Sequence, residues 1–179
     1  MALLAVFIIG GFFLVRSIGL KNLELKKSKT EVEKLMELNL DDNYPGSARE
    51  VLKVYNRILK CCYNEDLTDE QIKKLAEQNQ KLFDEQLLEK NPLDQYVEKL
   101  KKDIKDYKDK KTTIANIAIQ DLAEAEREER GGYKFCNLLV SYIVKDTKGL
   151  KTTNEKYYLR EDDKGRWKIL FWELTYKTF

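Results

Sequence analysis

The chain contains no histidine among its 179 residues. Histidine is the commonest general base and the most frequent metal-ligating side chain, and serine and cysteine nucleophiles usually depend on one. Its absence excludes those mechanisms in their usual form. We therefore expect no cofactor and no metal ion, and the composition favours a binding protein over an enzyme.

Cysteine is also scarce, with three residues and no C-x-x-C motif. An odd number cannot form a closed disulfide framework, and the spacing is not that of a metal site. Cys61 and Cys62 fall on a predicted helix and Cys136 on a predicted strand, which favours packing as small apolar side chains. A disulfide between Cys136 and one helix cysteine is the alternative if the domain lies in an oxidising compartment.

Neither sign of charge is in excess, because 33 basic residues face 31 acidic ones and the net charge is +2. A nucleic-acid surface concentrates positive charge on one face. The lysine-rich stretch over residues 98–111 instead pairs its lysines with acids at helical i,i+4 spacing, which is typical of a solvated helix face. We therefore expect no nucleic-acid partner.

An acidic run over residues 121–129 resembles a cation site only at first sight. A calcium site needs several oxygen ligands that converge on one point, with Asp, Asn and Gly in a fixed order. Arg127 interrupts the run, and that order is missing. The run is therefore predicted to be a solvated loop.

The only long hydrophobic run covers residues 2–15 and is followed by Arg16. Alone it would span about 21 Å as a helix, whereas a bilayer core is about 30 Å thick. Extension to Leu20, with the Arg16 side chain reaching the headgroups, gives about 30 Å. We predict a single-pass anchor in the cell membrane over residues 1–20, with the lipid bilayer as partner. Its apolar contacts are Ala2, Leu3, Leu4, Phe7, Ile8, Ile9, Phe12, Phe13, Leu14 and Val15.

Two other interpretations of this run stay open. A cleaved signal peptide would need a basic n-region and a small-residue cleavage site, and the run has neither in its usual form. Alternatively, Met1 is not the true start and a basic leader precedes it. The basic residues near the run lie on its C-terminal side, so the positive-inside rule alone puts the domain in the cytoplasm, and a missing leader would reverse this.

Three segments follow from the pattern: the anchor, a helical stalk and linker over residues 21–46, and an α+β domain over residues 47–179. Capping boxes at Ser47 and Thr68 predict the starts of two helices, and Asn91 followed by Pro92 predicts a third. After residue 111 the apolar period changes from helical to alternating. We expect three helices packed on a curved antiparallel sheet of about four strands.

The last predicted strand has large apolar side chains on both faces. Strict alternation puts Trp167, Ile169 and Phe171 on one face and Leu170, Trp172 and Leu174 on the other. One face must meet the helices, and the other then forms a pocket or a contact surface. We predict a homodimer through the sheet.

The segments SAREVLKVYNRILKCCYNEDLTDEQ, KNPLDQYVEKLKKDIKDYK and YYLREDDKGRWKILFWEL resemble an uncharacterised family of Gram-positive bacterial proteins with one N-terminal membrane span. The order of elements resembles the nuclear transport factor 2-like, or cystatin-like, fold. The resemblance covers about residues 47–174 and implies that the domain lies outside the cytoplasm. It implies no catalytic residues.

Two functions are consistent with these features. The first is a membrane-tethered, non-catalytic binding or protein-interaction domain with an unidentified protein partner. The second is a small-pocket enzyme of the isomerase or hydratase type that uses a tyrosine and a carboxylate, as ketosteroid isomerases do. Asp84 and Asp103 are the nearest acids to such a pocket, and both are expected on the surface. The predicted ligand or partner surface comprises Tyr55, Tyr96, Tyr142, Trp167 and Trp172.

Overall fold

The computed structural model describes residues 28–179 of the chain. The predicted membrane anchor and the first part of the predicted stalk lie outside the described residues and stay predictions. Within the described part, no helix is both long and apolar enough to cross a membrane. Residues Glu31–Phe179 form one compact unit.

The described residues form five α-helices, followed by the sheet. Helix formation follows the sequence signals at two of the three predicted starts. The Ser47 hydroxyl accepts a hydrogen bond from the Glu50 amide at 3.2 Å, and Thr68 and Gln71 form a reciprocal capping box. The helices are α2 (Glu31–Met36), α3 (Ala48–Asn64), α4 (Asp69–Lys81), α5 (Glu85–Lys90) and α6 (Leu93–Asp109).

The third predicted cap was wrong. Asn91 ends α5, a helix that the periodicity did not predict, and its side-chain amide donates to the Leu87 carbonyl oxygen at 3.0 Å. Pro92 is the N-cap of α6 and provides no side-chain hydrogen bond. A six-residue helix is too short to show a clear 3.6-residue period, so periodicity alone does not indicate it.

The sheet is antiparallel, with strand order β1-β3-β4-β5, and β2 also pairs with β3. The acidic run does not form the predicted loop, because its second half is strand β2. Gly131 and Gly132 have φ angles of 61° and 80°, as a two-residue hairpin turn requires, and they join β2 to β3. The strands are β1 (Thr113–Ile119), β2 (Glu126–Arg130), β3 (Tyr133–Asp146), β4 (Gly149–Glu161) and β5 (Trp167–Thr175), with the short 3-10 helix η1 (Leu122–Glu124) between β1 and β2.

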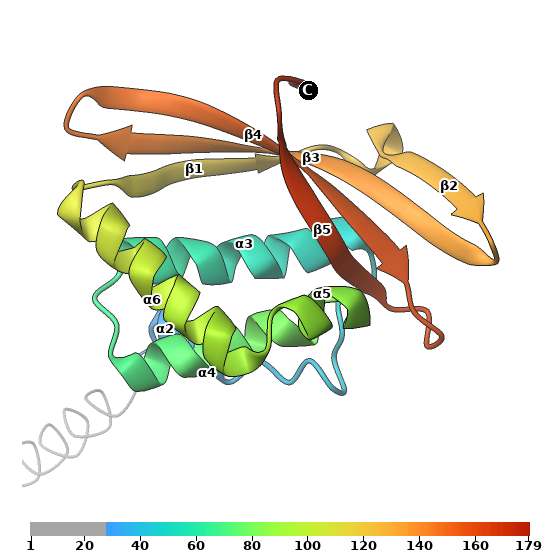
Figure 1. The fold of residues 1–179 in the computed structure, drawn as a ribbon, viewed down its shortest axis with the longest axis horizontal. Helices are drawn as coiled ribbons and strands as arrows, with labels where there is room; N and C mark the ends of the chain where they lie inside the picture. Colours follow the sequence, from blue (N-terminus) through green and yellow to red (C-terminus); the bar gives the residue numbers. More distant parts are fainter. Residues whose placement is uncertain (1–27) are drawn as a thin grey trace, which may run out of the picture. The chain divides into compact units, whose positions relative to one another are not determined.

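The helices lie on one face of the sheet (Figure 1). One buried cluster joins α3 to the sheet and includes Val51, Leu138 and Leu159. A second cluster joins the helices to one another and includes Ile58 and Leu75. Helices and sheet each bury an apolar face in this way, which is the α+β class predicted from the sequence.

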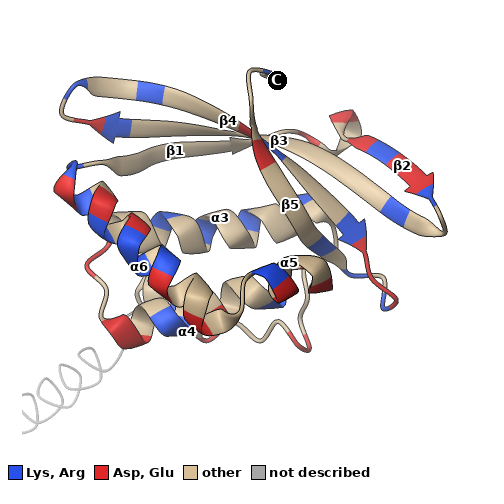
Figure 2. Cartoon of the chain, viewed as in Figure 1, with Lys and Arg blue, Asp and Glu red and all other residues tan. Residues whose placement is uncertain are grey.

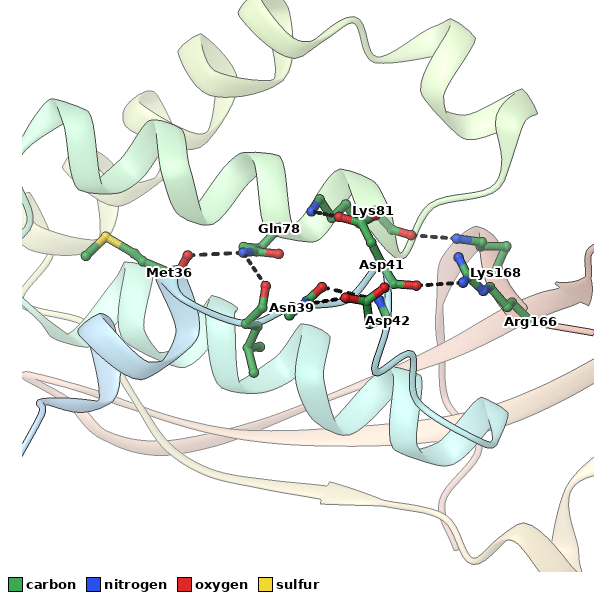
Figure 3. A network of polar contacts seen from close by, with 9 residues as sticks. Met36, Asn39, Asp41, Asp42, Gln78, Lys81, Arg166 and Lys168 are labelled. Atoms are coloured by element: carbon green, nitrogen blue, oxygen red, sulfur yellow. Dashed lines mark hydrogen bonds and ion pairs between the residues drawn. The ribbon is translucent and has the colours of Figure 1, made fainter. Parts of the chain in front are cut away.

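The segment before α3 packs against the domain. Val32 and Leu35 are buried in the cluster between the helices. Figure 3 shows the polar contacts of the connection that follows, in which the Gln78 amide donates to the Met36 carbonyl oxygen at 3.1 Å. Lys81 forms an ion pair with Asp41 at 2.7 Å. The compact unit begins at Glu31, so it includes residues 31–46 of the predicted stalk and linker.

A bulge in β5 changes which side chains face the helices. Leu159 pairs with Ile169, but Tyr158 pairs with Phe171, so Leu170 has no partner on β4. Ile169 is fully buried, whereas Phe171 is 43% exposed on the opposite face. The strict alternation predicted for this strand was therefore wrong, because a bulge adds one residue to one strand.

All three cysteines are buried and free. Cys136 belongs to the cluster between α3 and the sheet, and Cys61 and Cys62 belong to the cluster between the helices. The thiols therefore pack as small apolar side chains, as the sequence predicts. Burial raises the pKa of Cys62 to about 12, so its reactive thiolate is disfavoured.

Charged residues of both signs are interspersed along α6 and β2 (Figure 2). On α6, Lys105 pairs with Asp109, and Lys101 pairs with Asp69 of α4 at 2.8 Å. All five residues of β2 are exposed. The lysine-rich stretch is thus a solvated helix face with ion pairs.

Candidate functional site

A cavity of about 320 Å³ lies between α3, α6 and the inner face of the sheet. Its wall is unusually rich in aromatic side chains, with six tyrosines and one tryptophan among the lining residues. They are Tyr55, Tyr63, Tyr96, Tyr107, Tyr142, Tyr157 and Trp172. Leu59, Leu100, Ile114 and Val144 add apolar wall.

Four of the five residues predicted to form a ligand or partner surface meet at this cavity: Tyr55, Tyr96, Tyr142 and Trp172. They come from α3, α6, β3 and β5, and so from four separate segments. Trp167 does not join them, because it lines another hollow beside Ala48. Ligand binding by these residues stays a prediction.

The aromatic rings hold one another in place. Trp172 stacks on Tyr157 with ring centroids 5.8 Å apart, and Tyr55 contacts both rings at 5.8 and 6.0 Å. Tyr63 of α3 stacks on Tyr107 of α6 at 4.3 Å. Aromatic pairs at such distances are favourable beyond the area that they bury. The wall is therefore built from fixed rings on facing elements.

A chain of short polar contacts runs from the cavity into the core. It starts at the Glu155 carboxyl group, which lies 2.7 Å from the Tyr157 hydroxyl. The Tyr157 and Tyr142 hydroxyls are 2.7 Å apart, and Tyr142 donates to the Asn56 side-chain oxygen at 2.6 Å. The Asn56 amide donates to the Leu52 carbonyl oxygen at 2.8 Å. Glu155 and Tyr157 share a face because alternate residues of a strand do so.

Burial sets the ionisation of these groups. It raises the pKa of Glu155, although hydrogen bonds from Tyr157 and Tyr142 act in the opposite direction. It also raises the pKa values of Tyr55, Tyr142 and Tyr157 far above that of a free tyrosine. The tyrosines are therefore neutral hydroxyls, and Glu155 is the inner acid of the cavity.

Counting hydrogens identifies the charge state that best fits the chain. Its three oxygen–oxygen contacts are all 2.6–2.7 Å long, so each needs one hydrogen. The hydroxyls of Tyr142 and Tyr157 supply two of these hydrogens. The Asn56 amide supplies none, because it donates to the Leu52 carbonyl oxygen. A protonated Glu155 supplies the third, by donating to Tyr157 while Tyr157 donates to Tyr142. The geometry is thus complete when Glu155 is neutral, in agreement with its raised pKa.

Residues 1–172 match a protein family described as "Domain of unknown function (DUF6715)". The chain belongs to this family. A comparison with curated proteins found no match. The family description names no chemistry for this DUF6715 chain.

The cavity acid that contacts the buried tyrosine hydroxyls, Glu155, is not one of the two acids predicted from the sequence. Asp84 is not on the surface as expected: it is 4% exposed and forms two hydrogen bonds with Arg160 at 2.8 and 2.9 Å. Asp103 is exposed, as expected, and lines the cavity beside Lys99. Glu155 was missed, although its spacing of two residues from Tyr157 on a predicted strand was the signal that pairs them.

A metal site is not evident in the part of the DUF6715 chain that the structure describes, because no three Cys, Asp or Glu side chains there are grouped to hold an ion. In the acidic run, charged side chains contact other parts of the protein. Glu126 pairs with Lys156 at 2.6 Å, and Arg127 donates to the Leu122 carbonyl oxygen at 3.1 Å. Two of the run's charged side chains are thus engaged in contacts with the protein.

Proposed function

We propose that the chain is a membrane-tethered, non-catalytic binding protein that holds a small organic molecule in the tyrosine-lined cavity. The observation that carries this proposal is the cavity itself. Its volume of about 320 Å³ lies within the range of small-molecule sites, which is roughly 300–1,000 Å³. Such sites combine apolar and aromatic walls with a few polar groups, as Glu155 and the tyrosine hydroxyls do here.

The polar groups favour binding over catalysis. A catalytic acid or base must exchange its proton with a substrate. The hydrogens of Tyr157 and Tyr142 are instead engaged within the chain that ends at Asn56. Such a network fixes the rings and the carboxyl group in one arrangement, which reduces the entropy lost when a ligand binds.

The tether is proposed from residues 2–15, whose apolar composition suits a helix in lipid. We propose a single-pass topology with the domain outside the cytoplasm. We also propose the nuclear transport factor 2-like fold, because the cavity lies between a sheet and the helices on one of its faces. The full chain should resist extraction from membranes by alkaline carbonate. A chain that lacks residues 2–15 should be extracted, and release of both would contradict the tether.

Two tryptophans provide a direct test of the cavity. Trp172 lines it and Trp167 does not, so the two indole N–H signals of the full chain labelled at tryptophan are a site and an internal control. Screening of small amphipathic fragments by NMR should find compounds that shift the Trp172 signal and leave the Trp167 signal in place. If no fragment does so, the proposed site is wrong.

A matched pair of variants closes the same test. Thr153 lines the cavity, whereas Thr152 lies on the other face of β4. Thr153→Trp should fill part of the cavity and weaken fragment binding at least tenfold. Thr152→Trp should leave the affinity unchanged. Equal effects of both variants would show that the fragments bind elsewhere.

One contact favours an enzyme as the second candidate. A buried tyrosine hydroxyl, that of Tyr157, lies 2.7 Å from the Glu155 carboxyl group, and a carboxyl group with a raised pKa suits a general base. An isomerase of this kind removes a hydrogen beside a carbonyl group. Incubation of bound ketones in deuterated water should then give deuterium exchange that Glu155→Gln abolishes. Exchange no faster than the uncatalysed rate would exclude this candidate.

Homodimer formation through the sheet is proposed from its outer face. Phe171 is 43% exposed there and stacks on Tyr158 with ring centroids 4.2 Å apart. An exposed aromatic pair on a sheet face suits a contact with a second copy. Sedimentation of the full chain should give a dimer, and Phe171→Asp should give a monomer. A monomeric wild-type chain would contradict the proposal.

A further inference from the structure

We propose that the cavity is selective for a small primary amine with an apolar or aromatic body, bound as its ammonium ion on Glu155. This inference rests on the proposed function, because it names the class of ligand for the same cavity. It is carried by the direction of the hydrogens in the polar chain and by the aromatic wall around the carboxyl group.

The polar chain presents an acceptor to the cavity. Whether Glu155 is neutral or ionised, Tyr142 and Tyr157 use their hydrogens within the chain. The contact with Tyr157 uses one oxygen of Glu155, Oε2. The other oxygen, Oε1, takes no part in that contact and is an acceptor in both charge states. A ligand that binds this group must therefore bring a hydrogen-bond donor.

The aromatic wall favours a donor that carries positive charge. The ring centroids of Tyr55, Tyr157 and Trp172 lie within 6.0 Å of one another. Tyr157 is two residues from Glu155 on the same face of β4. Ring faces attract cations, and the attraction is strongest where water is excluded. An ammonium group offers both the hydrogens that Oε1 accepts and the charge that the rings attract.

The charges around the cavity are consistent with this ligand. Besides Glu155, the titratable groups that line it are the tyrosines of α3, α6, β3 and β4 and the pair Lys99 and Asp103 on α6. Lys99 contacts the Asn91 side-chain oxygen at 3.4 Å, so this cation has a protein partner. Asp103 adds a second carboxyl group to the lining. Two acids thus face one lysine.

Binding of the ammonium ion would be coupled to loss of a proton. The ligand-free chain of contacts is complete when Glu155 is neutral, and an ammonium ion favours its ionised form. The proton that leaves Glu155 passes to the buffer and no other covalent bond changes, but one of the three oxygen–oxygen contacts of the chain then has no hydrogen, which the contact with the ammonium ion must offset. The proposed complex is therefore a carboxylate–ammonium pair within an aromatic wall.

Three probes of similar size separate charge from shape. 2-Phenylethylamine is an ammonium ion at neutral pH, 2-phenylethanol is a neutral donor, and 3-phenylpropanoate is an anion. Their affinities for the full chain are measured by calorimetry, and the Trp172 indole signal confirms the site. We expect the amine to bind at least tenfold more tightly than the alcohol and the propanoate to bind more weakly than both.

The chain offers a matched control for the key residue. The Glu173 carboxyl group lies 2.6 Å from the Tyr158 hydroxyl on the outer face, much as Glu155 lies 2.7 Å from the Tyr157 hydroxyl on the inner face. Glu155→Gln should weaken binding of the amine about tenfold and affect binding of the alcohol far less, because glutamine keeps an acceptor oxygen but cannot carry the negative charge. Glu173→Gln should change neither. Titration of the amine in two buffers of different ionisation enthalpy should also show release of a proton.

The outcomes separate this inference from the proposed function. If the alcohol binds as tightly as the amine, or if Glu155→Gln has no effect on the amine, the inference is overturned while the cavity remains a binding site. If none of the three probes binds, the inference is overturned as well. The proposed function is then decided by the fragment screen, which does not depend on charge.

Discussion

The Glu155 carboxyl group lies 2.7 Å from the Tyr157 hydroxyl on the inner face of β4. On the outer face, the Tyr158 hydroxyl donates to Glu173 at 2.6 Å. The two pairs have the same chemistry, but burial raises the pKa of Glu155, whereas Glu173 lies in solvent. Two faces of one sheet thus give the same residue types different properties, and each pair is a control for the other.

The first prediction concerns pH. The pKa of Glu155 is above its ordinary value of 4.5, so the folded chain binds this proton more tightly than the unfolded chain. This contribution to the free energy of unfolding is complete below about pH 4.5 and is lost as the pH rises through the folded pKa. Glu155→Gln should remove that loss, because a glutamine amide can donate to Tyr157 without ionising.

Urea unfolding of the wild type and of Glu155→Gln from pH 4 to pH 8 tests this prediction. Other acids also contribute to the pH dependence. Hydrogen bonds from Lys151 and Lys81 lower the pKa values of Asp146 and Asp41, so the contributions of these two acids to the free energy of unfolding are lost at low pH. The difference between the wild type and the variant isolates the contribution of Glu155. The free energy of unfolding of Glu155→Gln should rise relative to that of the wild type as the pH rises. A constant difference across the range would refute the raised pKa.

The second prediction concerns the middle of the polar chain. Tyr157→Phe removes the hydroxyl that contacts both Glu155 and Tyr142, and so leaves two buried groups without a partner. We expect a loss of about 1–3 kcal/mol in the free energy of unfolding. Tyr158→Phe should cost less than about 0.5 kcal/mol, since its hydroxyl donates to an exposed acid on the solvent face of the sheet.

Local signals predicted much of this fold. A capping box depends only on residues three apart, so Thr68 and Gln71 could be paired from the sequence. Ser47 forms half of its predicted box, because the Glu50 carboxylate pairs with Lys53 instead. The alternating strands and their turns were visible for the same reason. The wall of the cavity was partly visible, because its tyrosines lie on predicted apolar faces.

Features that depend on distant partners were not predicted. Glu126 and Arg127 lie in a strand because they pair with Asn137 and Cys136 of β3. The charged sequence around them, taken alone, predicts a loop. The bulge beside Leu170 changes the face of every side chain before it, and no local pattern marks it. These features depend on tertiary pairing, which overrides local preference.

The third prediction concerns the buried ion pair between Asp84 and Arg160. Asp84 is 4% exposed, its two oxygens bond to the guanidinium group, and it also caps α5 through the Gln86 amide at 3.0 Å. Asp84→Ala leaves a largely buried arginine without this partner and removes the cap. We expect a loss of about 3–5 kcal/mol in the free energy of unfolding.

Glu85 provides the matched control for that change. It also contacts Arg160, at 3.2 Å, but its side chain is 80% exposed. Surface ion pairs contribute about 0–1 kcal/mol, so Glu85→Ala should have little effect. Equal losses from the two substitutions, measured by urea unfolding, would show that burial of Asp84 does not determine its contribution.

The fourth prediction uses adjacent residues on opposite faces of β5. Trp172 stacks on Tyr157 and contacts Tyr55 in the cavity wall, whereas Phe171 is 43% exposed and stacks only on Tyr158 among the described aromatic rings. Trp172→Ala should lower the free energy of unfolding by about 2–4 kcal/mol and abolish fragment binding, because it removes part of the wall. Phe171→Ala should cost less than about 1 kcal/mol and leave fragment binding intact, because a cross-strand pair contributes no more than that. Thermal unfolding and fragment titration of both variants give the comparison. If Phe171→Ala weakened fragment binding as much as Trp172→Ala did, the bulge would not separate the two faces, and the cavity would not be the site.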